Sequence, residues 1–277
     1  MDFKENFRIG GGPIETGQMF FQKTQVSVLG FAIYYKDEDG DLRLQHVNYL
    51  SEILSHDSLF VIDCLTKLFS DSFMSRFNDV CFWSDCGPHF RSAEILAFIY
   101  HQLPQLRQGQ YFLNFFAEHH GKSVVDGHFG VLTNWFSAVE AVRNVRNIHD
   151  LVELFREKTV NRPNLNSKTP EYFFDIYDRF EPRGVTHKLT VKNLCSYLAF
   201  VRVGNKLFAS TLSTLDYTKY TEVAFKVTAG IDKRETKRAP KRQSMDIDVP
   251  VVVGPNSKRM LLRRIRLARK YRMETGT

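Results

Sequence analysis

Three aspartates that are far apart in the sequence each adjoin an apolar run with the length of a strand or the period of a helix. Asp2 opens the first run, Asp85 directly follows the apolar residues 79–84, and Asp126 stands near the start of a helical pattern that begins at Ser123. Carboxylate oxygens suit Mg²⁺ or Mn²⁺, and two such ions about 3.5–4 Å apart can activate the attacking oxygen and stabilise the leaving oxygen of a phosphodiester. Acids beside glycine or serine are also common turn and capping residues. The order of the three aspartates favours phosphodiester chemistry over three unrelated caps.

Polar residues just before the third aspartate supply alternatives for the same site. Glu118 ends a predicted strand and competes with Asp126 for the role of third metal ligand, its ordinary role being that of a capping or surface carboxylate. His119, His120 and Lys122 are expected to contact the scissile phosphate or to orient the acids. Histidines at strand ends are more commonly structural, so both interpretations stay open.

The elements that must position these residues follow from hydrophobic periodicity. Strands are predicted over 2–9, 25–35, 42–50, 79–84 and 111–117, and helices over 59–69, 90–102 and 123–147. Glu5 in the first strand and the pair His56–Asp57 are candidates to support the metal ligands, although His56 and Asp57 also fit an N-cap of the following helix. The order of three strands, helix, strand, helix, strand and helix predicts an α/β fold. We expect a mixed sheet flanked by helices, as in ribonuclease H.

Five short motifs resemble the catalytic region of DDE/D-type transposase-like proteins encoded in eukaryotic genomes. They cover about residues 2–135 and read DFKENF at 2–7, FAIYYKD at 31–37, LSEILSHD at 50–57, FWSDCG at 82–87 and FFAEHHGKSVVDG at 115–127. The resemblance implies that Asp2, Asp85 and Asp126 bind two Mg²⁺ or Mn²⁺ ions in a ribonuclease H-like domain. It further implies an enzyme that cleaves and joins DNA strands at transposon ends. Cys86 and His128 depart from the pattern, since they stand where the family tends to have small residues or glycine.

Transposases usually also need a DNA-binding module. Because the first strand begins at Asp2, an upstream half of that strand and an N-terminal DNA-binding module are expected to lie outside this sequence. The chain would then be a fragment, a domesticated remnant, or a subunit that borrows DNA targeting from another subunit. A homo-oligomer is a further expectation.

The sequence predicts three parts: a catalytic domain at 1–160, an extension at 161–231 and a basic tail at 232–277. In the extension, a linker at 161–170 precedes alternating residues at 185–227 that are typical of a small β unit. Its aromatic residues, flanked by Lys and Arg, fit stacking on nucleic acid as well as an ordinary strand core.

The positive charge is concentrated in the tail. The chain has a net charge of +7, yet residues 232–277 hold 14 Lys or Arg against 5 Asp or Glu, and the remainder is slightly acidic. Such a segment is either solvated or serves as a nuclear-import signal or DNA-binding arm. The candidate DNA-binding residues are Lys233, Arg234, Lys237, Arg238, Lys241, Arg242, Arg263, Arg264 and Arg266. We expect a nuclear protein whose partner is DNA.

Composition excludes several other classes of protein. Hydrophobic residues make up 43% of the 277 residues, which suits a globular core with an appendage. The four cysteines have no paired CxxC spacing, so neither a zinc site nor a disulfide framework is expected. No apolar stretch approaches 18 residues, so no association with membranes is expected.

Two functions therefore remain. The first is a metal-dependent transposase or nuclease, which the retention of all three aspartates favours. The second is a catalytically silent DNA-binding or assembly protein that keeps the fold and uses its basic tail.

Overall fold

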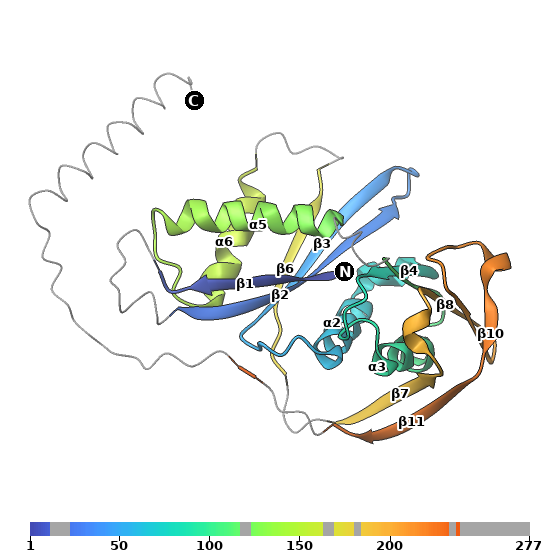
Figure 1. Ribbon diagram of the computed structural model, residues 1–277. Coiled ribbons are helices and arrows are strands. Elements are labelled where there is room, and N and C mark those ends of the chain that lie inside the picture. The colour runs from blue at the N-terminus through green and yellow to red at the C-terminus, as the bar shows by residue number, and fades with distance from the viewer. Residues whose placement is uncertain (12–22, 117–122, 163–168, 180–183, 233–236, 239–277) are drawn as a thin grey trace, which may run out of the picture. The chain divides into compact units, whose positions relative to one another are not determined.

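Two mixed sheets, a separate pair of strands and the helices packed against them make up the described part of the chain (Figure 1). The computed structural model describes residues 1–11, 23–116, 123–162, 169–179, 184–232 and 237–238. The fold is therefore α/β with mixed sheets flanked by helices, as the element order predicted.

The first sheet has the strand order β1-β2-β3-β6. Its strands are β1 (Asp2–Ile9), β2 (Thr24–Lys36), β3 (Leu42–Ser51) and β6 (Glu171–Ile176). Strands β1, β2 and β3 are antiparallel in sequence order, and β6 lies parallel to β3. Strands β2 and β3 form a hairpin, joined by the acidic, glycine-containing segment 36–41 that is typical of a turn.

The second sheet has the order β10-β9-β8-β5-β4. Its strands are β4 (Asp79–Ser84), β5 (Gln110–Phe115), β8 (Ala199–Val203), β9 (Lys206–Ser210) and β10 (Thr221–Val223). Only the pair β4–β5 is parallel. A separate antiparallel pair joins β7 (Val185–Val191) to β11 (Phe225–Ile231). The extension predicted at 161–231 thus contributes strands to both sheets, in addition to this pair.

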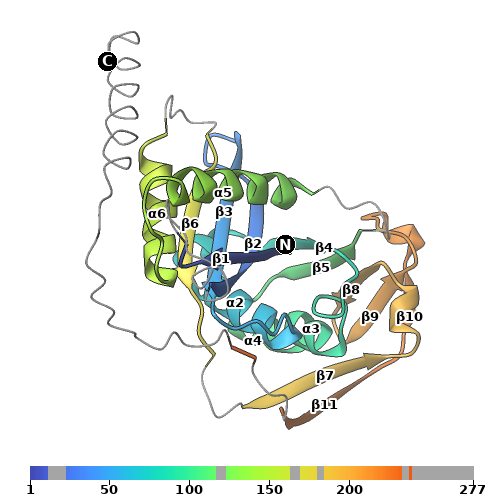
Figure 2. The ribbon, with the colours of Figure 1, turned by 60° about the vertical axis from the view of Figure 1, so that its left-hand side comes forward.

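The described α-helices are α2 (Ser58–Ser70), α3 (Ala93–Ala97), α4 (Leu103–Leu106), α5 (Val124–Glu140) and α6 (Ile148–Val160). Helices α5 and α6 cover one face of the first sheet, and α2 packs on the other, as Figure 2 shows. Helix α3 contacts β7. On β2, Val26 and Val28 pack with α5 and α6, whereas Leu29 and Phe31 pack with α2. This alternation follows from the two-residue period of a strand.

A bulge in β1 allows side chains of that strand to pack on both faces of the first sheet. Phe3 pairs with Leu29 and packs with the α2 cluster, but Phe7 pairs with Val26 and packs with the α5 cluster. The register shifts between Lys4 and Phe7, and an extra residue in a strand moves the following side chains to the opposite face.

Two predicted helices have different bounds in the structure. The helix predicted over 123–147 ends at Glu140, and a second helix, α6, begins at Ile148 after the N-cap Asn147. The helix predicted over 90–102 begins at Ala93, where the Ser92 side chain accepts a hydrogen bond from the backbone of Ile95. Local capping, which periodicity does not detect, sets these bounds.

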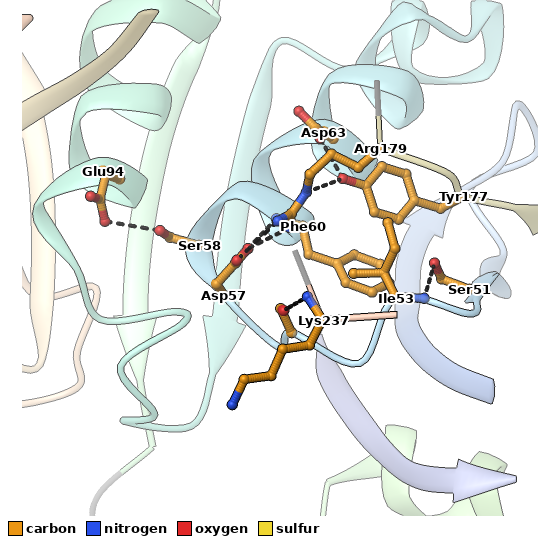
Figure 3. Close-up of polar contacts among 11 residues, drawn as sticks. Ser51, Ile53, Asp57, Ser58, Phe60, Asp63, Glu94, Tyr177, Arg179 and Lys237 are labelled. Atoms are coloured by element: carbon orange, nitrogen blue, oxygen red, sulfur yellow. Dashed lines mark hydrogen bonds and ion pairs between the residues drawn. The ribbon is translucent and has the colours of Figure 1, made fainter. Parts of the chain in front are cut away.

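A buried ion pair fixes the start of α2 (Figure 3). Arg179 is only 4% exposed and donates from Nη2 to Asp57 Oδ1 at 2.7 Å and from Nη1 to Asp57 Oδ2 at 3.2 Å. Asp57 is also the N-cap of α2, because it accepts a hydrogen bond from Phe60 N at 2.9 Å. Tyr177 accepts from Arg179 Nε at 3.3 Å and donates to Asp63 on α2. These contacts tie the segment after β6 to the N-terminus of α2.

Two stacked histidines lie between β3 and α5. The rings of His46 and His128 are 4.0 Å apart, and both residues are 3% exposed. Asn48 Nδ2 donates to the Phe173 carbonyl, so Asn48 Oδ1 must accept from His128 Nε2, at 2.7 Å. His128 is therefore the neutral Nε2–H tautomer. Burial lowers the pKa of His46 to about 4 and that of His128 to about 3.

These lowered pKa values predict loss of stability in acid. Above the unfolded pKa of 6.5 both imidazoles are neutral in both states; as pH falls toward 4, only the unfolded chain takes up protons. Proton uptake by the unfolded chain therefore lowers the stability of the fold as the pH falls from about 6.5 toward 4. His46→Phe should reduce the fall in Tm between pH 7.5 and pH 5, and His149→Phe, at an exposed position of α6, should not. An unchanged pH dependence in His46→Phe would contradict this assignment.

Among the described residues, no helix is long and apolar enough to cross a membrane.

Candidate active site

Asp2 lies at the start of β1, on the face of the first sheet that α5 covers. It pairs with Gly30 of β2, and directly opposed residues of an antiparallel pair point to the same face. A Cβ atom at Gly30 would come within 2.6 Å of the Phe129 ring. The missing side chain lets α5 approach β2 closely. Glycine at position 30 thus brings the start of α5, with Asp126, toward Asp2.

Asp85 directly follows β4, and β4 meets the start of β1. The Met1 nitrogen donates to the Trp83 carbonyl at 2.8 Å, which places the residue after β4 near Asp2. Asp85 Oδ1 accepts a hydrogen bond from Gly87 N at 2.9 Å, which closes a tight turn. The Asp85 side chain is 53% exposed.

Asp126 occupies the third position of α5 and forms a capping box. Its Oδ2 accepts from Ser123 N at 2.7 Å and from Ser123 Oγ at 3.0 Å. Such a pair satisfies backbone donors that a helix start leaves without partners. Asp126 therefore acts as a capping residue, which is the alternative role of an acid beside serine.

The three aspartates interact through their charges. Burial, then the negative charge of Asp85 and, more weakly, that of Asp126 raise the pKa of Asp2 to about 6. Like charges disfavour ionisation when they lie near one another. Among the described residues, however, no three His, Cys, Asp or Glu side chains are grouped closely enough to hold one metal ion. The fold gathers the aspartates into one electrostatic environment without forming a closed ligand cluster.

His89 adjoins Asp85, and the sequence reasoning missed it. Its Nε2 lies 3.9 Å from Asp85 Oδ1, is buried, and has no hydrogen-bond partner among the described residues. Burial lowers the pKa of His89. A Cβ atom at Gly87 would fall within 2.9 Å of both the His89 ring and Asp85 Oδ1, so glycine there lets the two approach. His89 could have been identified from the sequence by its position in a turn, four residues after an acid, in the run Asp85-Cys86-Gly87-Pro88-His89.

Phe3 connects His89 to His56, one of the predicted supporting residues. The Phe3 ring stacks on His56 at 4.3 Å and meets the edge of His89 at 5.0 Å. His56 Nε2 is hydrogen bonded to Ser27 Oγ at 2.9 Å. Asp57, rather than His56, caps α2. Two imidazoles thus flank the residue that follows Asp2.

The remaining candidates lie apart from this cluster or outside the description. Glu118, His119, His120 and Lys122 fall outside the described residues. Glu5 is exposed on β1, and its backbone carbonyl accepts from Lys4 Nζ at 3.1 Å.

Of the predicted DNA-binding residues, the structure describes only Lys237 and Arg238. Arg238 Nη1 lies 2.6 Å from Asp178 Oδ1, and its Nη2 donates to the Arg179 carbonyl at 3.2 Å. Lys237 N donates to Ser55 Oγ at 2.8 Å, and the Lys237 carbonyl accepts from Leu54 N. The segment is thus bound along residues 53–55, and the Arg238 guanidinium is paired with a carboxylate of the same chain. Lys233, Arg234, Lys241, Arg242, Arg263, Arg264 and Arg266 lie outside the described residues.

A family profile described as a domain of unknown function, DUF8701, matches residues 1–168. The chain belongs to this family. The matched part of the DUF8701 protein contains β1 to α6, including Asp2, Asp85, Asp126 and His89. No curated protein and no solved structure matches the chain. The transposase resemblance therefore stays a prediction for this DUF8701 protein.

Proposed function

We propose that this DUF8701 protein is a metal-dependent polynucleotidyl transferase or nuclease of transposase type. The observation that carries the proposal is the electrostatic coupling of Asp2, Asp85 and Asp126, which come from a first strand, the end of a fourth strand and the helix after a fifth. That placement of acids is the one expected of a ribonuclease H-like fold. The contact between Met1 and Trp83, which brings the ends of β1 and β4 together, supports the same fold.

The donor chemistry of the site fits a hard divalent cation. Backbone hydrogen bonds from Phe3 and Gly87 engage Oδ1 of Asp2 and Oδ1 of Asp85. We expect Asp2 and Asp85, with Asp126 as the third ligand, to be the residues that would hold Mg²⁺ or Mn²⁺. A divalent cation would supply charge that activates the attacking oxygen and stabilises the leaving oxygen.

Residues of the chain itself would complete the site. Neutral His89 can accept a proton from the attacking water or hydroxyl, because its Nε2 faces the Asp85 carboxylate. The Phe3 ring, packed between His56 and His89, restrains both imidazoles. We expect DNA as substrate, a nuclear location, and either a DNA-targeting partner subunit or a homo-oligomer.

Nicking of supercoiled plasmid DNA tests this proposal. The full chain should convert supercoiled to open-circular DNA with Mg²⁺ or Mn²⁺, and excess EDTA should stop the reaction. Purified protein that binds DNA but makes no nick with either ion, under a range of salt and pH, would contradict the proposal.

Two observations favour a second candidate, a catalytically silent DNA-binding or assembly protein. The Asp126 carboxylate already has a structural role in the capping box, and the described residues form no closed three-ligand cluster. In this case, DNA affinity would depend on the basic tail and not on the aspartates.

Deleting residues 242–277 tests the role of the tail while keeping the bound segment at 237–238. The deleted part holds nine Lys or Arg against three Asp or Glu. If it contacts about six phosphates, the affinity of the full chain for duplex DNA should fall roughly a thousandfold between 50 and 200 mM salt. The truncated chain should bind weakly with a shallow salt slope, as measured by fluorescence anisotropy. A chain with the order of 242–277 scrambled should keep the affinity, and unchanged affinity after deletion would assign binding to the core.

A further inference from the structure

Lys237 and Arg238 of the basic tail lie against the core. The Lys237 carbonyl accepts from Leu54 N at 2.6 Å, and Lys237 N donates to Ser55 Oγ at 2.8 Å. Arg238 forms an antiparallel β-bridge with Ile53. The Lys237 side chain points away from this surface, as Figure 3 shows. The backbone, and not the lysine ammonium group, therefore makes this part of the contact.

The Arg238 side chain makes a second contact, with the segment after β6. Its Nη1 donates to Asp178 Oδ1 at 2.6 Å, and its Nη2 donates to the Arg179 carbonyl at 3.2 Å. The Arg238 and Asp178 side chains are 42% and 67% exposed. Ion pairs that are this exposed contribute little to stability, and salt screens them. The contact therefore uses the fork of a guanidinium but is weak enough to open.

DNA would use the same groups of Arg238. Residues 233–242 hold six Lys or Arg against one Glu, which is typical of a segment that binds polyanions. A phosphate accepts two parallel hydrogen bonds from a guanidinium, as a carboxylate does. Nη1 and Nη2 of the docked Arg238 already donate to Asp178 and Arg179. A phosphate that binds this side of the guanidinium must therefore displace Asp178.

We propose that the docked pair Lys237–Arg238 is an autoinhibitory latch, which withholds Arg238 from DNA until a duplex displaces Asp178. Docking and phosphate contact exclude each other at Arg238, so each weakens the other by the same factor. Opening the latch also frees Leu54 N from the Lys237 carbonyl. The inference rests on the DNA binding in the proposed function, but it does not require nicking.

An alanine variant of Asp178 opens the latch in the full chain. Asp178→Ala removes the exposed carboxylate that accepts from Arg238. Asp39→Ala, in the exposed turn between β2 and β3, changes the net charge equally and leaves the latch closed. Asp178→Ala should bind a short DNA duplex about threefold more tightly than Asp39→Ala, because less of the chain is held in the docked state. Equal affinities in fluorescence anisotropy would overturn the proposal.

A second substitution tests whether the gain acts through Arg238. If Asp178 weakens DNA binding only by holding Arg238, the gain from Asp178→Ala should vanish when Arg238→Gln is also present. Asp178→Ala/Arg238→Gln should then bind the duplex as Asp39→Ala/Arg238→Gln does. A gain that persists without the arginine would overturn the latch and assign the effect to the Asp178 charge alone.

Hydrogen exchange reports whether DNA opens the latch. The Leu54 amide donates to the Lys237 carbonyl, whereas the Phe60 amide donates to Asp57 within the core. Saturating duplex should speed the exchange of Leu54 at least about threefold and leave that of Phe60 unchanged, which separates local opening from unfolding. In Asp178→Ala, Leu54 should exchange faster before DNA is added. Unchanged or slower exchange of Leu54 on binding DNA would overturn the proposal.

Nicking by the same preparations distinguishes the latch from the proposed function. Loss of nicking together with a retained difference in affinity between Asp178→Ala and Asp39→Ala would refute the nuclease and support the latch. Nicking together with equal affinities of the two variants would overturn the latch and leave the nuclease function intact.

Discussion

Replacing Asp85 with asparagine is expected to abolish the metal-dependent nicking of DNA. Asparagine keeps the Oδ1 atom that accepts from Gly87 N, so the turn after β4 should stay intact. It removes the negative charge that a cation needs. Loss of several kcal/mol of transition-state stabilisation corresponds to a nicking rate of about one thousandth of the wild-type rate, or below that. The measurement is the initial rate of plasmid nicking with Mn²⁺ for wild type and Asp85→Asn.

A matched control distinguishes loss of chemistry from loss of fold. Asp39 lies exposed in the turn between β2 and β3, away from the site, and Asp39→Asn should nick DNA as wild type does. Circular dichroism and Tm of Asp85→Asn should match wild type. Equal nicking by Asp85→Asn and wild type would refute the assignment of Asp85 as a ligand.

Replacing Arg179 with methionine should destabilise the fold by about 3–5 kcal/mol, because it leaves Asp57 without its buried partner. The guanidinium is almost wholly buried and makes a two-pronged ion pair with Asp57 and a hydrogen bond to Tyr177. The expected result is a lower denaturant midpoint with an unchanged m-value in urea unfolding.

An exposed ion pair of the same geometry supplies the comparison. Arg143 donates to both carboxylate oxygens of Glu157, and their side chains are 47% and 53% exposed. Arg143→Met should therefore cost less than about 1 kcal/mol. In the double variant Arg179→Met/Asp57→Asn, the neutral amide keeps the helix cap and should recover part of the stability lost. Similar losses in Arg179→Met and Arg143→Met would contradict a structural role for the buried pair.

Much of the fold could be predicted from hydrophobic periodicity. The strand Asp2–Ile9 has the bounds that the sequence predicted, and the hairpin of β2 and β3 follows directly from the acidic turn at 36–41. Most of the apolar residues at helical spacing, Val125, Phe129, Leu132, Phe136 and Val139, are buried on α5. Val142, which the same pattern includes, follows the helix and is exposed. The predicted end of that helix was wrong by seven residues. The apolar residues of the connecting segment continue the helical pattern, whereas Asn147 caps the start of a new helix.

The candidate site was predicted in part. The three aspartates could be selected from their types and their order, but the capping box of Asp126 and the approach of His89 to Asp85 depend on local backbone geometry. The docking of Arg238 on Asp178 was not predictable, because the two residues are 60 positions apart and the ion pair forms only once the segment at 237–238 lies along residues 53–55.

The sequence by itself determined which segments form strands and helices, because the alternation of apolar side chains depends on near neighbours in the chain. It also determined the types of the candidate ligands and the concentration of charge in the tail. Only the tertiary structure decided how strands far apart in the sequence divide between two sheets, that Gly30 brings α5 over Asp2, and that Lys237 and Arg238 dock along residues 53–55. Those features depend on the register between distant segments, which long-range packing fixes and local propensity does not encode.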